Sequence, residues 1–334
     1  MSFYSDKKTN RLQISIKKIG GKQYRYASSY IYVDKGHLIA KNKSLGRVGV
    51  ATDTEKRLEE FKNTLITTEI AERVKYWKPK ISQSKAFQYV PIARIEELRT
   101  KLNRKKDELG GIGKAAMATA FSIDFIYNSN KIEGSRLPQK RVVELSKMGG
   151  NNEVANTMRA IDYFDNQKFP VSLSVLKDGQ KILLAHEESK HGFRTEPMVV
   201  GSAELLDHKD IKKNLEELTA WYKDQESKIY PLELAFLFHY KFERIHPFPD
   251  GNGRVGRILM NVILKKHRFH PIIVWNTKRN SYFASFTKAM NGNKVPFLRF
   301  MIEQYRMTYE KYLPKIEKAS SFDDQLKEFL KPTV

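Results

Sequence analysis

Hydrophobic residues recur at helical spacing along most of the chain beyond residue 90. Ile95, Leu98 and Leu102 form one apolar stripe, and Phe121 and Phe125 belong to the next. Intervals of three and four residues are typical of amphipathic helices packed on a common core. Further helices are predicted at 142–148, 154–164, 173–184, 211–222, 232–245, 255–267, 281–290 and 296–312. The pattern therefore predicts a mainly α-helical fold.

The first fifty residues follow a period of two instead. Leu12, Ile14 and Ile16 alternate with polar residues, which predicts a half-buried strand. Gly20-Gly21 and Asp34-Lys35-Gly36 are typical turn sequences, and they separate three such segments. The pattern predicts a small antiparallel β-meander added to the helical core.

Four tyrosines share one parity on the second strand of this meander: Tyr24, Tyr26, Tyr30 and Tyr32. Side chains two positions apart lie on the same face of a strand. We expect this face to pack inward. The alternative is a stacking platform for nucleic-acid bases, since lysine and arginine are interleaved with the tyrosines.

Three regions follow from these patterns. A helix is predicted from Thr52-Asp53-Thr54 to about Pro79, and 79–90 is expected to be a linker. The predicted division is a basic N-terminal region of meander and helix at 1–85, a catalytic domain at 86–312, and a C-terminal tail at 313–334.

Composition narrows the function classes. No apolar run reaches the roughly 18 residues that a membrane span needs, so we expect a soluble, cytoplasmic protein without membrane contact. There is no cysteine, which excludes disulfides and thiol catalysis. The net charge is +22, and residues 1–50 contribute 11 Lys/Arg against 2 Asp/Glu. Such a segment is compatible with nucleic acid, anionic lipid, an acidic protein or a solubilising surface.

Candidate chemistry is concentrated in residues 246–257, which read HPFPDGNGRVGR. A glycine-rich turn directly before a helix directs backbone N–H groups to one point, where the helix dipole favours an anion. Arg254 and Arg257 suit phosphate oxygens, and Asp250 suits Mg²⁺. His246 can act as a general base near neutral pH. These residues indicate nucleotide chemistry on a hydroxyl group.

This segment resembles the Fic family signature, His-x-Phe-x-Asp/Glu-Gly-Asn-Gly-Arg-x-x-Arg, at every fixed position. The resemblance covers roughly residues 88–310. It implies a helical Fic core with a β-hairpin flap, and transfer of AMP from Mg-ATP to Ser, Thr or Tyr hydroxyls of a protein. The implied site is His246 as base, Asp250 on Mg²⁺, Gly251, Asn252 and Gly253 around the α-phosphate, Arg254 on the phosphate chain, Arg257 on the γ-phosphate, and Tyr282 near the adenine.

A second motif, Ser129-Asn130-Lys131-Ile132-Glu133-Gly134, is similar to the family's inhibitory helix and precedes the catalytic core. The resemblance implies that Glu133 pairs with Arg257, shielded from water, and prevents productive binding of the γ-phosphate. It also implies that residues 192–201 form the flap, which docks a segment of the target protein as an added strand.

Three other functions stay open. A phosphate-transferring toxin of the Doc type uses a similar scaffold, although Gly253 argues against it because those proteins usually carry lysine there. Some Fic proteins remove AMP with the help of the inhibitory glutamate. A nucleic-acid-binding regulator, contacting its partner through residues 1–50 and using the Fic site secondarily, is the rival from a different class. The target protein and a homodimeric state are left open by the sequence.

Overall fold

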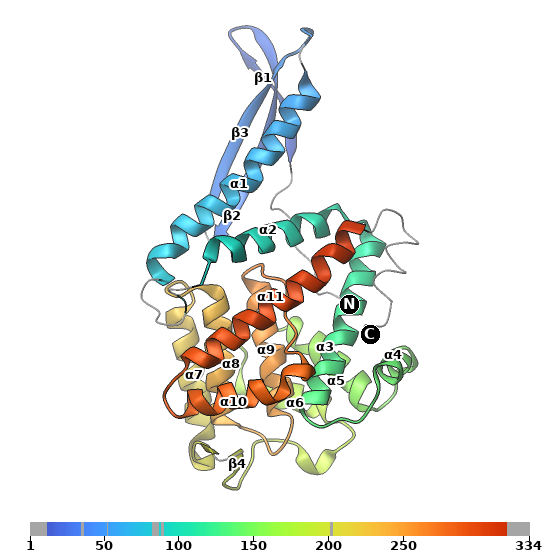
Figure 1. Cartoon of the computed structure of the whole chain (residues 1–334), viewed down its shortest axis with the longest axis vertical. Coiled ribbons are helices and arrows are strands. Elements are labelled where there is room, and N and C mark those ends of the chain that lie inside the picture. Colours follow the sequence, from blue (N-terminus) through green and yellow to red (C-terminus); the bar gives the residue numbers. More distant parts are fainter. Residues whose placement is uncertain are drawn as a thin grey trace.

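The structure is a computed structural model, which describes residues 12–34, 37–51, 53–81, 87, 90–200 and 203–318. Ten helices make up the body of the described chain (Figure 1). They are α2 (Ile92–Glu108), α3 (Gly111–Ile132), α4 (Gln139–Met148), α5 (Glu153–Asp165), α6 (Leu173–Leu183), α7 (Ile211–Gln225), α8 (Pro231–Ile245), α9 (Asn252–Lys266), α10 (Arg279–Met290) and α11 (Val295–Lys318). The predicted helical fold is confirmed, and α11 continues past the predicted end at residue 312.

Helix α9 lies at the centre of the body and is buried along almost its whole length. It packs against α8, which precedes it in sequence. Gly256 permits this close approach, because a Cβ atom there would lie 2.8 Å from Nδ1 of His239 on α8. Gly179 does the same for α6, where an added Cβ would lie 2.1 Å from the ring of Phe164 on α5. Small residues at these contacts allow the helices around the signature turn to pack tightly.

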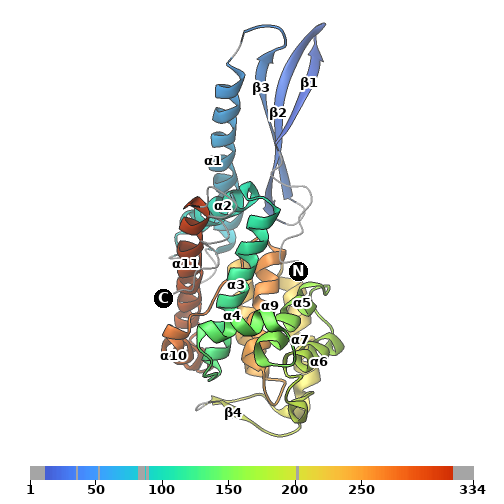
Figure 2. The same cartoon turned by 90° about the vertical axis from the view of Figure 1, so that its right-hand side faces the viewer.

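An arm projects from one end of the body and consists of a three-stranded sheet and the long helix α1 (Thr54–Ile81) (Figures 1 and 2). The strands β1 (Gln13–Ile19), β2 (Lys22–Asp34) and β3 (His37–Arg47) pair antiparallel in that order. The predicted meander is thus confirmed. Its first turn contains Gly20 and Gly21, both with positive φ, as a tight hairpin requires. Lys35 and Gly36 of the second predicted turn lie outside the described residues.

Two predictions about the sheet are wrong. Strand β1 is exposed along its whole length rather than half-buried, because α1 does not cover that edge. The tyrosines of β2 do not form the packed face either. The opposite parity packs on Phe61 and Leu65 of α1, through Ala27, Ile31 and Val33. The tyrosine row therefore lies on the face of the sheet that is turned away from α1.

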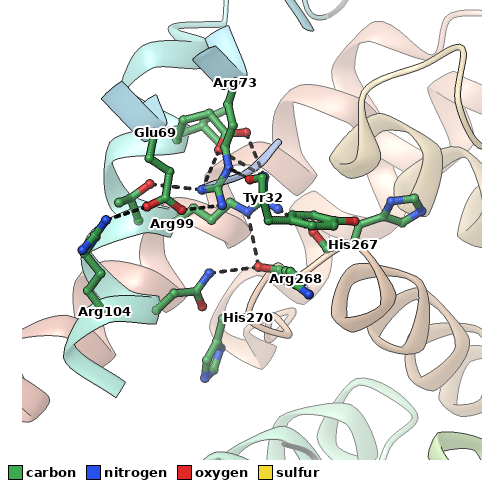
Figure 3. Close-up of polar contacts among 12 residues, drawn as sticks. Tyr32, Glu69, Arg73, Arg99, Arg104, His267, Arg268 and His270 are labelled. Carbon is green, nitrogen blue, oxygen red and sulfur yellow. Dashed lines mark hydrogen bonds and ion pairs between the residues drawn. The ribbon is translucent and has the colours of Figure 1, made fainter. Parts of the chain in front are cut away.

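Buried charged groups connect the arm to the body (Figure 3). Arg73 of α1 pairs with Glu69 at 2.5 Å and lies 3.6 Å from Glu96 of α2. Glu96 also pairs with Arg99, which donates to the carbonyl of His267 at the end of α9 at 2.6 Å. All four charged side chains are almost fully buried. The predicted linker is partly helical, since α1 continues to Ile81; the three-part division of the chain stays a prediction.

None of the helices in the described parts of the chain combines the length and the apolar character needed to cross a membrane.

Candidate functional site

His246 ends α8 in a left-handed conformation, with φ of 47°. This backbone turn sends the chain from α8 into the signature loop, and the loop leads into α9. The imidazole is mostly buried, and its Nδ1 lies 3.6 Å from Oε2 of Glu243, one turn earlier on α8. The carboxylate therefore faces one ring nitrogen, which leaves Nε2 as the basic atom.

The signature loop is closed by its own side chains. Asn252 accepts from the backbone N–H of Phe248 at 2.9 Å and donates to the carbonyl of Phe248 at 2.7 Å. Phe248 is fully buried and stacks on Phe193. The side chain of Asn252 is thus committed to holding the loop, and only its backbone N–H is available for an anion.

The N-terminus of α9 has the backbone geometry expected of an anion cradle, and the binding of a phosphate there stays a prediction. Gly251 precedes the helix with φ of 84°, and Asn252, Gly253 and Arg254 supply its first N–H groups. The first turn of a helix leaves such donors without an intrahelical acceptor. Arg254 is nearly buried, and its Nε has no hydrogen-bond partner among the described residues. A buried guanidinium donor beside unpaired N–H groups fits a phosphate, so the residues present suit a nucleotide.

Asp250 projects from the loop with its side chain about one third exposed. One carboxylate oxygen accepts from Arg254 at 3.0 Å, and the other pairs with Lys190 at 3.0 Å. Partial burial alone would raise the pKa of Asp250. Lys190, the charge of Arg254 and the N–H of Gly251 instead hold this pKa below its usual value. An ionised, partly accessible carboxylate fits a divalent cation that is bound together with phosphates.

Glu133 reaches Arg257 from the C-terminal end of α3, as expected. Oε1 of Glu133 lies 2.6 Å from the guanidinium of Arg257. Ser129 accepts from the same guanidinium through both its hydroxyl and its backbone carbonyl. Arg257 is fully buried, whereas the Glu133 side chain is 32% exposed, so the expected shielding applies to one partner only.

Gly253 makes room for this ion pair. A Cβ atom at position 253 would lie 2.2 Å from Oε1 of Glu133 and 2.9 Å from the guanidinium of Arg257. The carboxylate of Glu133 therefore lies directly over the start of α9, next to the anion cradle.

Tyr282 is buried in the described structure. Its hydroxyl lies 2.7 Å from Nε2 of His239, and the two rings are stacked. Phe283 and Phe286 surround it further. The contact of Tyr282 with an adenine, drawn from the family resemblance, stays a prediction.

The expected flap contains two very short strands, β4 (Val199–Val200) and β5 (Ala203–Glu204). Arg194 lies near its start and is almost fully buried. Its guanidinium donates to the carbonyls of His246, Glu196 and Leu206, while its backbone N–H donates to Pro247. Arg194 thereby fixes the base of the flap to the signature loop.

Three residues of this site are absent from the sequence-based assignments. Glu243 and Lys190 contact His246 and Asp250, and Arg194 holds the flap. Glu243 lies three residues before His246 on a predicted helix, a spacing that brings side chains together. The sequence contained this signal. Lys190 lies 60 residues before Asp250, and nothing in the local sequence connects the two.

Known proteins resemble this chain in sequence and in fold. A Fic/DOC family model matches residues 170–264. A protein adenylyltransferase Fic from Nematostella vectensis is 30% identical over 239 residues, which are 65% of this chain and 56% of the relative. The corresponding protein of Drosophila grimshawi is 28% identical over 243 residues, 66% of this chain and 50% of that protein. The chain thus spans about half the length of the curated relatives it matches.

Solved structures share the fold. A Fic-domain-containing signalling protein from Bacteroides thetaiotaomicron superposes with a TM-score of 0.59 at 22% identity, covering 68% of this chain and 98% of that one. Fic-1 from C. elegans superposes with a TM-score of 0.58 at 20% identity, covering 79% and 88%. Residues 170–264 thus match the Fic/DOC family model, and the chain shares the fold of solved Fic proteins.

Proposed function

We propose that the protein is an adenylyltransferase that transfers AMP from Mg-ATP to a hydroxyl side chain of a target protein. The observation that carries the proposal is the juxtaposition of a mostly buried histidine with an N-terminal helix cradle and an unpartnered buried guanidinium Nε. The adenylyltransferase names of the sequence relatives support the same activity.

The chain's residues can carry out this reaction by positioning and by charge stabilisation. The hydroxyl oxygen of the target attacks the α-phosphorus, and its proton passes to Nε2 of His246. The bond between the α-phosphorus and the oxygen bridging to the β-phosphate breaks, so pyrophosphate leaves. The N–H groups of Gly253 and Arg254 stabilise the charge that develops on the α-phosphate. Mg²⁺, for which Asp250 is the proposed ligand, would supply further neutralisation of the phosphate charge.

Glu133 is the proposed inhibitor of this activity. Its carboxylate pairs with the guanidinium of Arg257, which we assign to the γ-phosphate. It also adds negative charge beside an incoming triphosphate. Removing it should free Arg257 for ATP. The contacts of Arg257 with Ser129 would remain and keep the guanidinium in place.

The test compares wild-type protein, Glu133→Gly, and Glu133→Gly combined with His246→Ala, each with ATP labelled at the α- or the γ-phosphate. Self-modification serves as the assay because the target is not known. We expect α-label in protein from Glu133→Gly, less from wild type, and almost none from the double variant. Loss of a general base typically lowers the rate by about 10²–10⁴-fold. Incorporation of the γ-label instead would contradict AMP transfer and indicate phosphate transfer.

Removal of AMP is a second candidate function, and the exposure of Glu133 favours it. A carboxylate that is 32% exposed beside the phosphate cradle can hold a water molecule for hydrolysis. Pre-labelled protein distinguishes the two activities: wild type would release AMP, and Glu133→Gly would not.

A further inference from the structure

The open face of the arm's sheet presents an aromatic and polar surface. On β2 it contains Tyr24, Tyr26, Tyr30 and Tyr32; none is fully buried, and Tyr30 is 50% exposed. The register places Ser15 of β1 and Ser44 of β3 beside Tyr26 on this face. Tyr26 is thus flanked by hydroxyl-bearing side chains, whereas the cross-strand neighbours of Tyr30 and Tyr32 on β3 are Ala40 and Leu38.

The charged side chains at the surface of this sheet, among the described residues, are basic. Its strands contain seven basic residues: Lys17, Lys18, Lys22, Arg25, Lys41, Lys43 and Arg47. The single acidic residue of the described strands, Asp34, is buried. Lys17, Lys22 and Arg47 belong to the tyrosine face by register, and the ammonium group of Lys17 lies 4.9 Å from the ring of Tyr26.

The body of the protein adds one more cation at the base of this face. Arg268, directly after α9, places its guanidinium 3.9 Å from the centre of the Tyr32 ring (Figure 3). The row of aromatic rings and cations therefore continues from the hairpin to the helical body.

We propose that this face binds single-stranded nucleic acid, with bases stacked on the tyrosines and phosphates paired with the flanking cations. Tyr24 and Tyr26, and likewise Tyr30 and Tyr32, are two positions apart, which is about 7 Å on a strand; Ser28 lies between the two pairs on the same face. Stacking of unpaired bases on aromatic side chains in a cationic groove or sheet is the usual mode of single-strand binding. A duplex hides its base faces and would make little use of the rings.

The distribution of apolar residues argues against a protein or lipid partner at this face. The exposed Ile14 and Ile16 pair with Ala27 and Arg25 of β2, and so belong to the side that faces α1. On the tyrosine face the exposed Ile19 and Leu38 lie at opposite ends of the sheet, beside Lys22 and Tyr32, so they do not form the aliphatic centre that a protein interface or an inserting membrane surface would use.

The experiment measures fluorescence anisotropy of a fluorescein-labelled 20-nucleotide single strand with the full chain. We expect binding that weakens steeply with salt. Tyr26→Ala combined with Tyr30→Ala should weaken it by at least tenfold, since each stacked base contributes roughly five- to a hundredfold. The corresponding Phe variants should bind like wild type, because the rings are kept. Unchanged melting temperatures and far-ultraviolet spectra will establish that the Ala variants are folded.

A matched pair of charge variants locates the surface. Lys17→Ser with Arg47→Ser removes two cations from the tyrosine face, and Lys41→Ser with Lys43→Ser removes two from the other face. Only the first pair should weaken binding by more than about threefold. The proposal is overturned if the Ala variants bind like wild type, if both charge pairs act equally, or if a duplex, polyglutamate or phosphatidylserine vesicles compete as well as the single strand.

Discussion

Glu243 and His246 show how one buried carboxylate can organise the reactive histidine. Oε2 of Glu243 faces Nδ1 of His246 at 3.6 Å, and its other oxygen lies 3.8 Å from Nδ1 of His239. Burial alone would raise the pKa of Glu243. The contact with His246 and the positive charge of Arg257 instead lower it. A carboxylate that stays ionised in this position keeps the proton of His246 on Nδ1 and Nε2 free to accept one.

Glu243→Gln should therefore impair the chemical step more than nucleotide binding. In a Glu133→Gly background we expect kcat for AMP transfer to fall by about 10- to 100-fold, because an amide does not select the reactive tautomer. The KM for ATP should change less than about threefold, which steady-state kinetics will check. Glu243→Asp should retain more activity than Gln. A large rise in KM with unchanged kcat would show that Glu243 acts on the nucleotide instead.

Gly253 offers a way to displace the inhibitor without altering it. In Gly253→Ala the new methyl group would overlap Oε1 of Glu133, so the ion pair with Arg257 must open. We expect the unchanged Glu133 side chain to inhibit less in this variant. Self-labelling by α-labelled ATP should therefore rise at least a few-fold. In a Glu133→Gly background the same substitution should bring no further increase. Equal labelling of Gly253→Ala and wild type, with intact ATP binding, would count against a Glu133 block at this position.

At the scale of elements, the segment between α6 and the flap completes the site. The short helix η1 (Glu188–Lys190) ends with Lys190, whose ammonium group pairs with both Asp250 and Glu187. Arg194 then connects the following residues to the signature loop. The ammonium group of Lys190 thus pairs with the Asp250 carboxylate, which we assign to Mg²⁺. Lys190 must move away or share this carboxylate when the metal binds.

Lys190→Met should accordingly lower the Mg²⁺ concentration needed for half-maximal binding by roughly two- to fivefold, the value of a partly exposed ion pair. Calorimetric titration of Mg²⁺ into the protein with a non-hydrolysable ATP analogue measures this directly. Lys181→Met, an exposed lysine on α6, serves as the control. Weaker metal binding in Lys190→Met would mean that the lysine supports the phosphates rather than competing with the metal.

At the scale of the whole molecule, the buried network of Glu69, Arg73, Glu96 and Arg99 fixes the arm to the body (Figure 3). Glu96 is fully buried and also accepts from the hydroxyl of Tyr230 at 2.7 Å. Its removal takes the carboxylate from the buried Arg99 and leaves Arg73 with Glu69 alone of its two carboxylate partners named above. The arm is thus coupled to the stability of the helical body that holds the proposed site.

Glu96→Ala should reduce the free energy of unfolding by about 3–5 kcal/mol, the usual cost of breaking a buried ion pair from one side. Glu97→Ala is the matched control, because this neighbour is on the same helix, is 33% exposed and pairs with the exposed Arg94 and Lys101; it should stay within about 1 kcal/mol of wild type. Urea denaturation followed by circular dichroism gives both values. Similar losses in the two variants would contradict a structural role for the network.

The pKa values of two buried histidines predict how the free energy of unfolding depends on pH. Burial lowers the pKa of His239 to about 4 and that of His270 to about 3, from 6.5 when unfolded. The unfolded chain therefore binds more protons below pH 6.5, and stability falls as the pH drops from 6.5 towards 4. Each histidine contributes at most about 1.4 kcal/mol per pH unit. His270→Gln should reduce the slope between pH 6.5 and 5, measured from urea midpoints; an unchanged slope would show that other groups dominate.

The sequence by itself determined the helical body and the three-stranded meander, because these depend on local periodicity. It also carries the chemistry proposed for residues 246–257, because that proposal depends on residue types in one short segment. It also identified Glu133 as a partner for Arg257. Only the tertiary structure decided which face of the meander is packed, since Ile14, Ile16 and the tyrosines have the alternation of buried strands and yet lie where α1 does not cover them. The contacts of Lys190 with Asp250 and of Arg73 with Glu96 likewise became visible only in three dimensions. Periodicity reports that a side chain lies on one face of an element; which element covers that face is settled by packing between distant parts of the chain.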